Sequence, residues 1–90
     1  MLPPYVWELA MSLFHFHLAD GVGFPDDEGT ELAGLAEARK HALRYAGALI
    51  AEASDAIWSR DWSLRVTNGD DLTLFSLTLV ATDATAARAR

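Results

Sequence analysis

The chain has 90 residues, of which 51% are hydrophobic and 22% are charged, and these values are typical of one small globular domain. Its 13 acidic and 7 basic residues give a formal net charge of −6, which argues against binding to nucleic acid or to an anionic membrane surface. Because the chain contains no cysteine, disulfides are excluded, and so small a domain must rely on good packing, a partner subunit or a ligand.

The first segment, residues 1–11, is predicted to be an appendage outside the domain. Pro3 and Pro4 prevent regular structure at its start. The apolar stretch Tyr5–Leu18 contains Glu8 and two histidines, and it is shorter than the roughly 20 residues that a membrane helix needs. No basic residue precedes it, as one would in a secretory signal. We therefore expect a cytoplasmic protein without a membrane span.

The next segment, Ser12–Leu18, is predicted to be a strand, because apolar residues recur with the period of two that places side chains on alternate faces. One face is fully apolar, whereas the other face carries Leu13, His15 and His17. Turn residues follow at Asp20-Gly21 and in the acidic run from Asp26 to Gly29. Between these turns, Phe24-Pro25 is predicted to be a short edge strand.

A long helix is predicted from Leu35 to about Ile57. One apolar stripe recurs at spacings of three and four along it, through Leu35, Ala38, Ala42, Ala46, Leu49, Ala53 and Ile57. Gly34 is an acceptable N-cap, and a carboxylate at Glu37 favours the helix dipole. Gly47 lies inside the helix, where it costs about 1 kcal/mol relative to alanine, and close packing is the only reason we find for it.

Two further strands are predicted at Trp62–Thr67 and Leu72–Val80, joined by a hairpin turn at Asn68-Gly69, whose residues tolerate positive φ. Trp62 is predicted to lie in the core and Trp58 to close it. The last strand is apolar on both faces, which is typical of a central or doubly covered strand.

The element order predicts an α+β fold, with a three- to four-stranded antiparallel sheet and one long helix packed on one face. The single domain is expected to span residues 12–81, and residues 82–90 are expected to fray. This packing leaves the other sheet face partly apolar and uncovered, so the appendage or a second subunit should cover it. The residues expected at such an interface are Leu13, His15, His17, Arg65, Phe75 and Leu77.

The order of the motifs resembles a known family. Phe14-His15-Phe16-His17 is followed by Asp20-Gly21, by Glu28–Leu32, by an alanine-rich helix, and by Trp62-x-Leu64-x-Val66 before an Asp/Gly turn. From Met11 to about Asp83 the chain is similar to the small bacterial proteins of domain of unknown function 6894. The resemblance implies a cytoplasmic single-domain protein and no activity. Because members of that family start near Met11, residues 1–10 are attributed to a misassigned start codon.

A looser likeness connects the chain to HicB-type antitoxin domains, which also place strands before a helix rich in Glu and Ala. The shared feature is the loop Asp26–Glu31 that leads into Leu35-Ala36-Glu37-Ala38.

The two histidines on one strand face could chelate a metal ion. The third ligand would be His41 or an acid from the turn, namely Asp26, Asp27 or Glu28. The alternative is that both imidazoles are half-exposed on the open sheet face and bind nothing. No cofactor is expected, because the glycines form neither a phosphate loop nor a dinucleotide fingerprint.

No catalytic signature is present: the serines lack a nucleophile elbow, and the paired carboxylates lie in turns that are predicted to be exposed. We therefore expect a non-enzymatic module that binds a protein partner or itself, as in a homodimer. The alternatives are an antitoxin-like regulator of a small toxin, and a metal- or small-ligand-binding domain that uses His15 and His17. A metal-dependent activity at these histidines is the one enzymatic exception.

Overall fold

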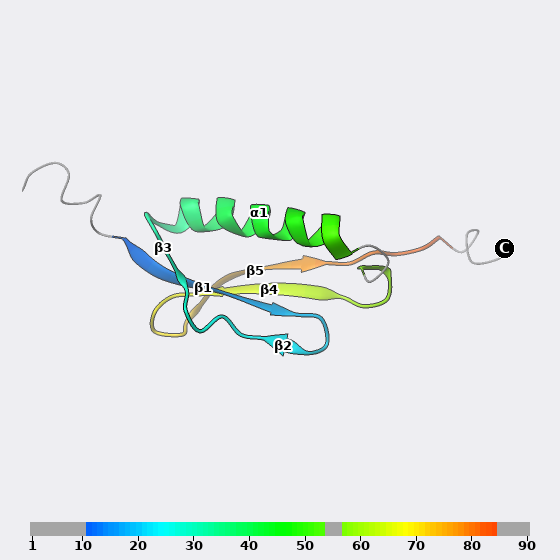
Figure 1. Cartoon of the computed structure of the whole chain (residues 1–90), viewed down its shortest axis with the longest axis horizontal. Helices are drawn as coiled ribbons and strands as arrows, with labels where there is room; N and C mark the ends of the chain where they lie inside the picture. Colours follow the sequence, from blue (N-terminus) through cyan, green and yellow to red (C-terminus); the bar gives the residue numbers. More distant parts are fainter. Residues whose placement is uncertain (1–10, 54–56, 85–90) are drawn as a thin grey trace, which may run out of the picture.

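The computed structural model describes residues 11–53 and 57–84. The elements in chain order are β1 (Ser12–Ala19), β2 (Gly23–Phe24), β3 (Thr30–Leu32), α1 (Leu35–Ala53), β4 (Trp62–Thr67) and β5 (Thr73–Leu79). All five strands pair antiparallel in the order β2-β1-β4-β5, with β3 also beside β1, and α1 lies along one face of the sheet (Figure 1). The α+β class and the single helix on one sheet face are confirmed, and the sheet has one strand more than predicted.

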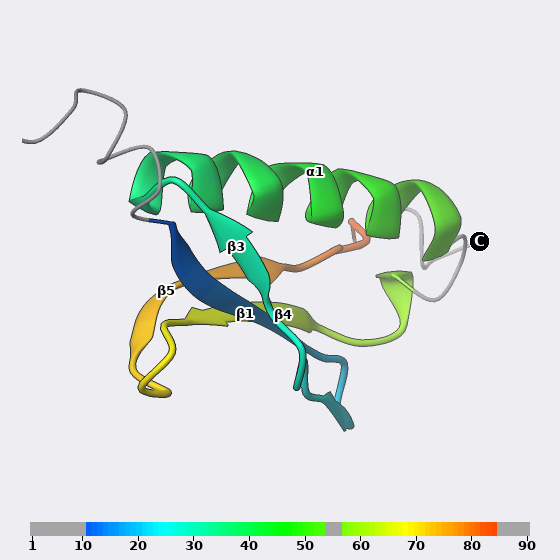
Figure 2. The same cartoon turned by 60° about the vertical axis from the view of Figure 1, so that its left-hand side comes forward.

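The additional strand is β3, which shares one edge of β1 with β2. Leu18 of β1 pairs with Phe24, and Ser12 pairs with Leu32. Residues 25–29 therefore stand opposite residues 15–17, so the two short strands form one interrupted strand with a bulged loop. Figure 2 shows β3 rising from this loop to the start of α1. A segment of three residues is too short to show a period, so the sequence did not predict it.

The core lies between α1 and the sheet. The buried face of the helix consists of small residues, which let the helix backbone approach the strands closely; these residues are Ala38, Ala42 and Ala46. Beneath them lie the buried side chains of the two central strands, Phe14, Phe16, Leu64 and Val66. Trp62 is buried, as predicted.

The helix begins where predicted, and the backbone N–H of Ala38 donates to the carbonyl of Gly34 at 2.9 Å. The helix is described as far as Ala53, residues 54–56 lie outside the described residues, and Ile57, near the predicted end, lies in a 3₁₀ turn. The prediction that Trp58 closes the core is wrong: it lies in a 3₁₀ turn and is 56% exposed. Close packing does not explain Gly47 either, because a Cβ added there would meet nothing within 4 Å.

The backbone conformation of the β4–β5 turn differs from the prediction. The residue with positive φ is Asp71 at 64°, rather than the Asn68-Gly69 pair. The side chain of Asn68 accepts hydrogen bonds from the backbone N–H groups of Asp70 and Leu72 at 2.9 and 3.0 Å. The hairpin itself is confirmed, and an asparagine side chain stabilises it.

The placement of Phe75 and Leu77 on the open face is wrong. Phe75 pairs with Val66 and Leu77 with Leu64, so both side chains point to the same face as these core residues. Both are half-buried against the core under α1. Alternation defines the two faces of a strand, but it does not show which of them the helix covers.

The predicted appendage, apart from Met11, lies outside the described residues, as do the last six residues of the predicted tail. Within the described residues, no helix combines the length and the apolar character that crossing a membrane requires.

Candidate functional site

The open sheet face brings together four of the six predicted interface residues. Leu13, His15 and His17 project from β1, and Arg65 on β4 is the cross-strand partner of His17. The guanidinium of Arg65 donates to the Thr73 hydroxyl at 3.1 Å. This face is therefore largely polar.

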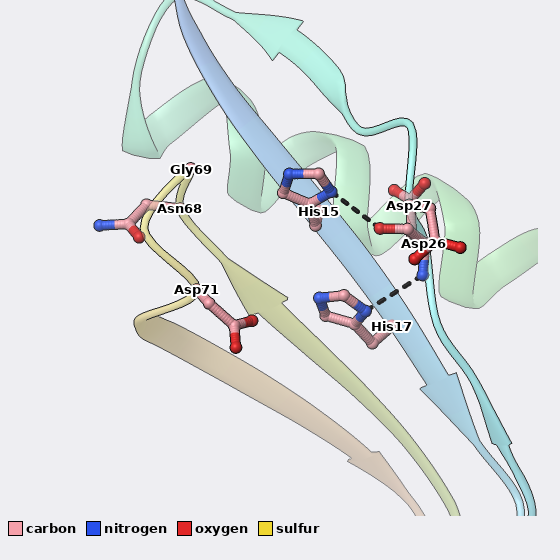
Figure 3. Close-up of a pocket in the computed structure, with 7 residues that line it drawn as sticks. All are labelled: His15, His17, Asp26, Asp27, Asn68, Gly69 and Asp71. Carbon is pink, nitrogen blue, oxygen red and sulfur yellow. Dashed lines mark hydrogen bonds between the residues drawn. The ribbon is translucent and has the colours of Figure 1, made fainter.

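A pocket of about 180 Å³ opens on this face between β1, the β2–β3 loop and the β4–β5 turn (Figure 3). Its lining consists of His15, His17, Asp26, Asp27, Asn68, Gly69 and Asp71. We call it the histidine pocket.

The backbone of one loop residue, Asp26, fixes both imidazoles. His15 donates from Nδ1 to the carbonyl of Asp26 at 2.8 Å, whereas the N–H of Asp26 donates to Nδ1 of His17 at 3.1 Å. The rings are stacked with their centroids 5.9 Å apart and an angle of 12° between their planes. Since one Nδ1 is a donor and the other an acceptor, the two neutral histidines are opposite tautomers.

The tautomers decide what each ring can do in the pocket. His17 carries its proton on Nε2 and donates it to the hydroxyl of buried Thr67 at 3.0 Å. His15 carries its proton on Nδ1, so its Nε2 is an acceptor, and no hydrogen bond joins it to another described residue. The ring edges opposite Asp26 point toward the β4–β5 turn (Figure 3). The pocket can therefore accept a hydrogen bond at His15 Nε2.

The carboxylate of Asp26 fills the gap between β2 and β3. It accepts hydrogen bonds from the backbone N–H groups of Phe16 at 3.1 Å and Gly29 at 3.0 Å. Burial raises the pKa of this carboxyl, but the backbone hydrogen bonds of Gly29, Phe16 and Glu28 and the electrostatic interaction with His15 outweigh burial. The pKa therefore lies below its ordinary value of 3.8, and Asp26 is an anion over most of the pH range.

The third ligand that a metal site would need is missing from the described part of the chain. His41 does not complete such a site, because it lies on the helix side of the sheet, with its ring 4.6 Å from that of Phe16. No group of three or more His, Cys, Asp or Glu side chains among the described residues could hold a metal ion.

A second surface lies along β5, which ends the sheet. No strand within the described residues pairs with its outer edge, and we call this outer edge of Thr73–Leu79 the β5 edge. The segment from Leu72 to Thr82 contains no charged residue, no glycine and no proline. Leu72 and Val80, which flank the strand, are each 61% exposed. Hydrogen-bonding groups and apolar side chains are thus both available along this edge.

The side of α1 above β5 continues the apolar surface. Arg39 lies 6.0 Å over the ring of Phe75, and the exposed Leu43 and Ile50 follow it by four and eleven residues, so all three share one side of the helix. A groove of about 530 Å³ then runs between the helix end and the end of β5. Its lining is uncharged and consists of Ile50, Ile57, Trp58, Thr78, Leu79, Val80, Ala81 and Thr82.

Comparison with known protein families gives a match. A family model described as a domain of unknown function, DUF6894, matches residues 13–81. The chain belongs to this family. The predicted membership is confirmed, whereas no comparison supports the likeness to HicB-type antitoxins. Neither the curated proteins nor the solved structures contain a match to the chain. The family description names no activity.

Sequence reasoning missed the part that Asp26 plays in this DUF6894 member, because it considered that residue only as an acidic ligand in a turn. A signal was present: Asp26 stands three residues before Gly29, the spacing at which an Asp side chain accepts a turn N–H. It also missed Thr67, because only the pairing of β1 with β4 brings the hydroxyl to His17.

Proposed function

We propose that this protein is a non-catalytic interaction module that binds a polypeptide strand along the β5 edge. The observation that carries the proposal is an uncharged strand of seven residues at the outer edge of the sheet. The unpaired N–H and C=O groups of an edge strand are a template for an added strand.

The character of the edge supports this proposal. Proteins commonly protect edge strands with lysine, proline or inward-pointing charges, and β5 has none of these along its length. The only register shift of the β4–β5 pair lies near the turn, between Val66 and Thr67. This shift leaves Leu74 without a partner on β4, so the regular part of β5 with which a second strand can pair is Phe75–Leu79.

The histidine pocket supports binding better than catalysis. A general acid at neutral pH needs a raised pKa, but the pKa of Asp26 is lowered, and its carboxylate oxygens already accept backbone N–H groups. Arg65 on the same face is engaged with Thr73. We therefore propose no reaction for this face.

The test is a charge placed in the middle of β5. Ser76 is exposed and lies opposite Arg65, so Ser76→Glu gains an ion pair within the chain, while an added strand would have to cover the new carboxylate. We expect tagged Ser76→Glu to capture its partner from host cells at least about tenfold less than wild type, equivalent to roughly 1.4 kcal/mol.

Ser76→Thr is the matched control, because it keeps the hydroxyl and favours the strand. It should capture as much partner as wild type. Equal capture by the Glu and Thr variants, with unchanged circular dichroism, would disprove strand addition at β5.

The same experiment separates two alternatives. An antitoxin-like role requires that the captured partner be a small basic protein, encoded by a neighbouring gene. Binding of a ligand or partner group at the histidine pocket is supported by the unpaired Nε2 of His15. In that case His15→Ala loses the partner and Ser76→Glu retains it, the reverse of what pairing at β5 predicts.

A further inference from the structure

We infer that the strand bound at the β5 edge is β5 of a second copy of this chain, paired antiparallel about a two-fold axis at Ser76. The inference rests on the proposed function and specifies its partner. A two-fold axis normal to the sheet would join the two sheets into one and place both helices on the same face.

The centre of β5 is self-complementary about Ser76, the middle residue of Thr73–Leu79. Antiparallel pairing about this residue places Phe75 opposite Leu77 of the second copy, on the face that α1 covers. On the open face, the two Ser76 side chains meet at the axis. Phe75 therefore meets Leu77 beneath the helices and the two Ser76 hydroxyls meet on the open face, whereas the outer pairs, Leu74 with Thr78 and Thr73 with Leu79, each join an apolar side chain to a hydroxyl.

The same register accounts for two exposed apolar residues beyond the strand ends. Leu72 lies four residues before Ser76 and Val80 four residues after it, and each is 61% exposed. In the two-fold pair, Leu72 comes close to Val80 of the second copy beyond the irregularity at Leu74, once at each end. Each copy thus covers an apolar side chain that the other leaves in water.

The charge distribution favours a second copy over a basic partner. The chain has a net charge of −6, so a site for a basic protein should present carboxylates. The β5 edge presents none, and the charged side chains placed next to it are those of Arg39 and Arg65. In the pair, the two β4 strands that carry Arg65 are three strand spacings apart, about 14 Å. This distance exceeds the Debye length of about 8 Å at physiological salt, so repulsion between the two Arg65 side chains is screened.

The apolar side of α1 above β5 adds surface to the same interface. Leu43 and Ile50 project from the side of α1 above β5, and the groove beside Ile50 continues to Val80. Pairing of β5 with its copy brings these side chains of the two helices toward each other above the middle of the joined sheet. Backbone pairing is thereby supplemented by burial of apolar area, which a lasting interface requires.

The mass of the purified full chain in solution tests the inference. Sedimentation velocity should give twice the chain mass of 9.8 kDa for wild type and Ser76→Thr, and the single chain mass for Ser76→Glu. If wild type is a monomer but still captures another protein, and Ser76→Glu loses this capture, the bound strand is not that of a second copy. The proposed function would then still hold. Capture that is insensitive to Ser76→Glu would overturn both.

A cysteine scan tests the axis. The chain has no cysteine, so Ser76→Cys introduces a single thiol per copy, and the two thiols meet at the proposed axis. We expect mild oxidation to convert it to a covalent dimer, while Ala48→Cys, at an exposed position of α1 on the side away from Leu43, stays largely uncrosslinked under the same conditions. A dimer that crosslinks equally at both positions would show that another surface forms it.

Discussion

At the scale of single residues, Asp26 connects the loop, the strand and both histidines. Its backbone N–H and C=O hold the two rings as opposite tautomers, and its carboxylate holds the N–H groups of Phe16 and Gly29. Those two groups lie where the interrupted strand β2–β3 leaves β1 without a partner. The loop therefore depends on an ionised side chain in place of a strand carbonyl.

This arrangement predicts the effect of Asp26→Asn and its pH dependence. Because the folded-state pKa of Asp26 lies below 3.8, its contribution to stability is present above the unfolded-state pKa and is lost as the pH falls through the folded-state value. We expect Asp26→Asn to lower the free energy of unfolding by roughly 1–3 kcal/mol at neutral pH. The difference from wild type should shrink below pH 3.8.

Urea denaturation over a pH series measures this difference. Asp27→Asn is the matched control, since its exposed carboxylate makes no hydrogen bond to another described residue. An Asp26→Asn variant whose loss of stability is the same at acid and neutral pH would show that the charge has no part in the effect.

Replacing Gly47 or Gly29 by alanine should change the stability of the protein in opposite directions. Gly47 lies inside α1 with open space around its position, so Gly47→Ala should stabilise the protein by about 1 kcal/mol. Gly29 has a φ of 76°, and a Cβ there would lie 2.9 Å from Cδ1 of Leu13, so Gly29→Ala should destabilise it. Thermal unfolding monitored by circular dichroism compares both variants with wild type. A stabilising Gly29→Ala or a destabilising Gly47→Ala would contradict this account.

At the scale of elements, the sequence predicted those parts whose signal is local. The stripe in α1 and the alternation in β4 are repeated over many residues, and the strand bounds Trp62–Thr67 were predicted without error. The strand β3 has three residues and exists because β1 offers it an edge, a fact that only the folded chain contains. The histidine pocket likewise needs the register that sets Asp26 between His15 and His17.

The error at Phe75 and Leu77 has a related cause. An alternating strand defines two faces, but the covered face is chosen by neighbours that are distant in sequence, here Val66 and Leu64. The apolar character of β5 on both faces predicted a central or doubly covered strand, whereas β5 is the last strand of the sheet within the described residues. A strand with the composition of a central strand at the edge of one chain is what an intermolecular sheet requires.

At the scale of the whole molecule, burial is limited. The largest fully buried side chains within the described residues are only Val66 and Thr67, while many large apolar side chains of α1, β5 and their flanks are exposed. A domain of this length buries only roughly 60% of its unfolded surface, so its free energy of unfolding is small. Pairing at β5 would add apolar burial where a single chain lacks it.

A stability that depends on pairing must depend on protein concentration. If folded chains exist as the β5-paired dimer and unfold to monomers, mass action raises the unfolding midpoint as the concentration rises. A tenfold increase contributes about 1.4 kcal/mol per dimer, or about 0.7 kcal/mol per chain, which corresponds to roughly 3–6 °C for a domain of this size. Wild type and Ser76→Thr should show this shift in thermal scans over a hundredfold range of concentration. Ser76→Glu, which folds without pairing, should show one midpoint throughout, and a wild-type midpoint equally independent of concentration would mean that the single chain carries all of its own stability.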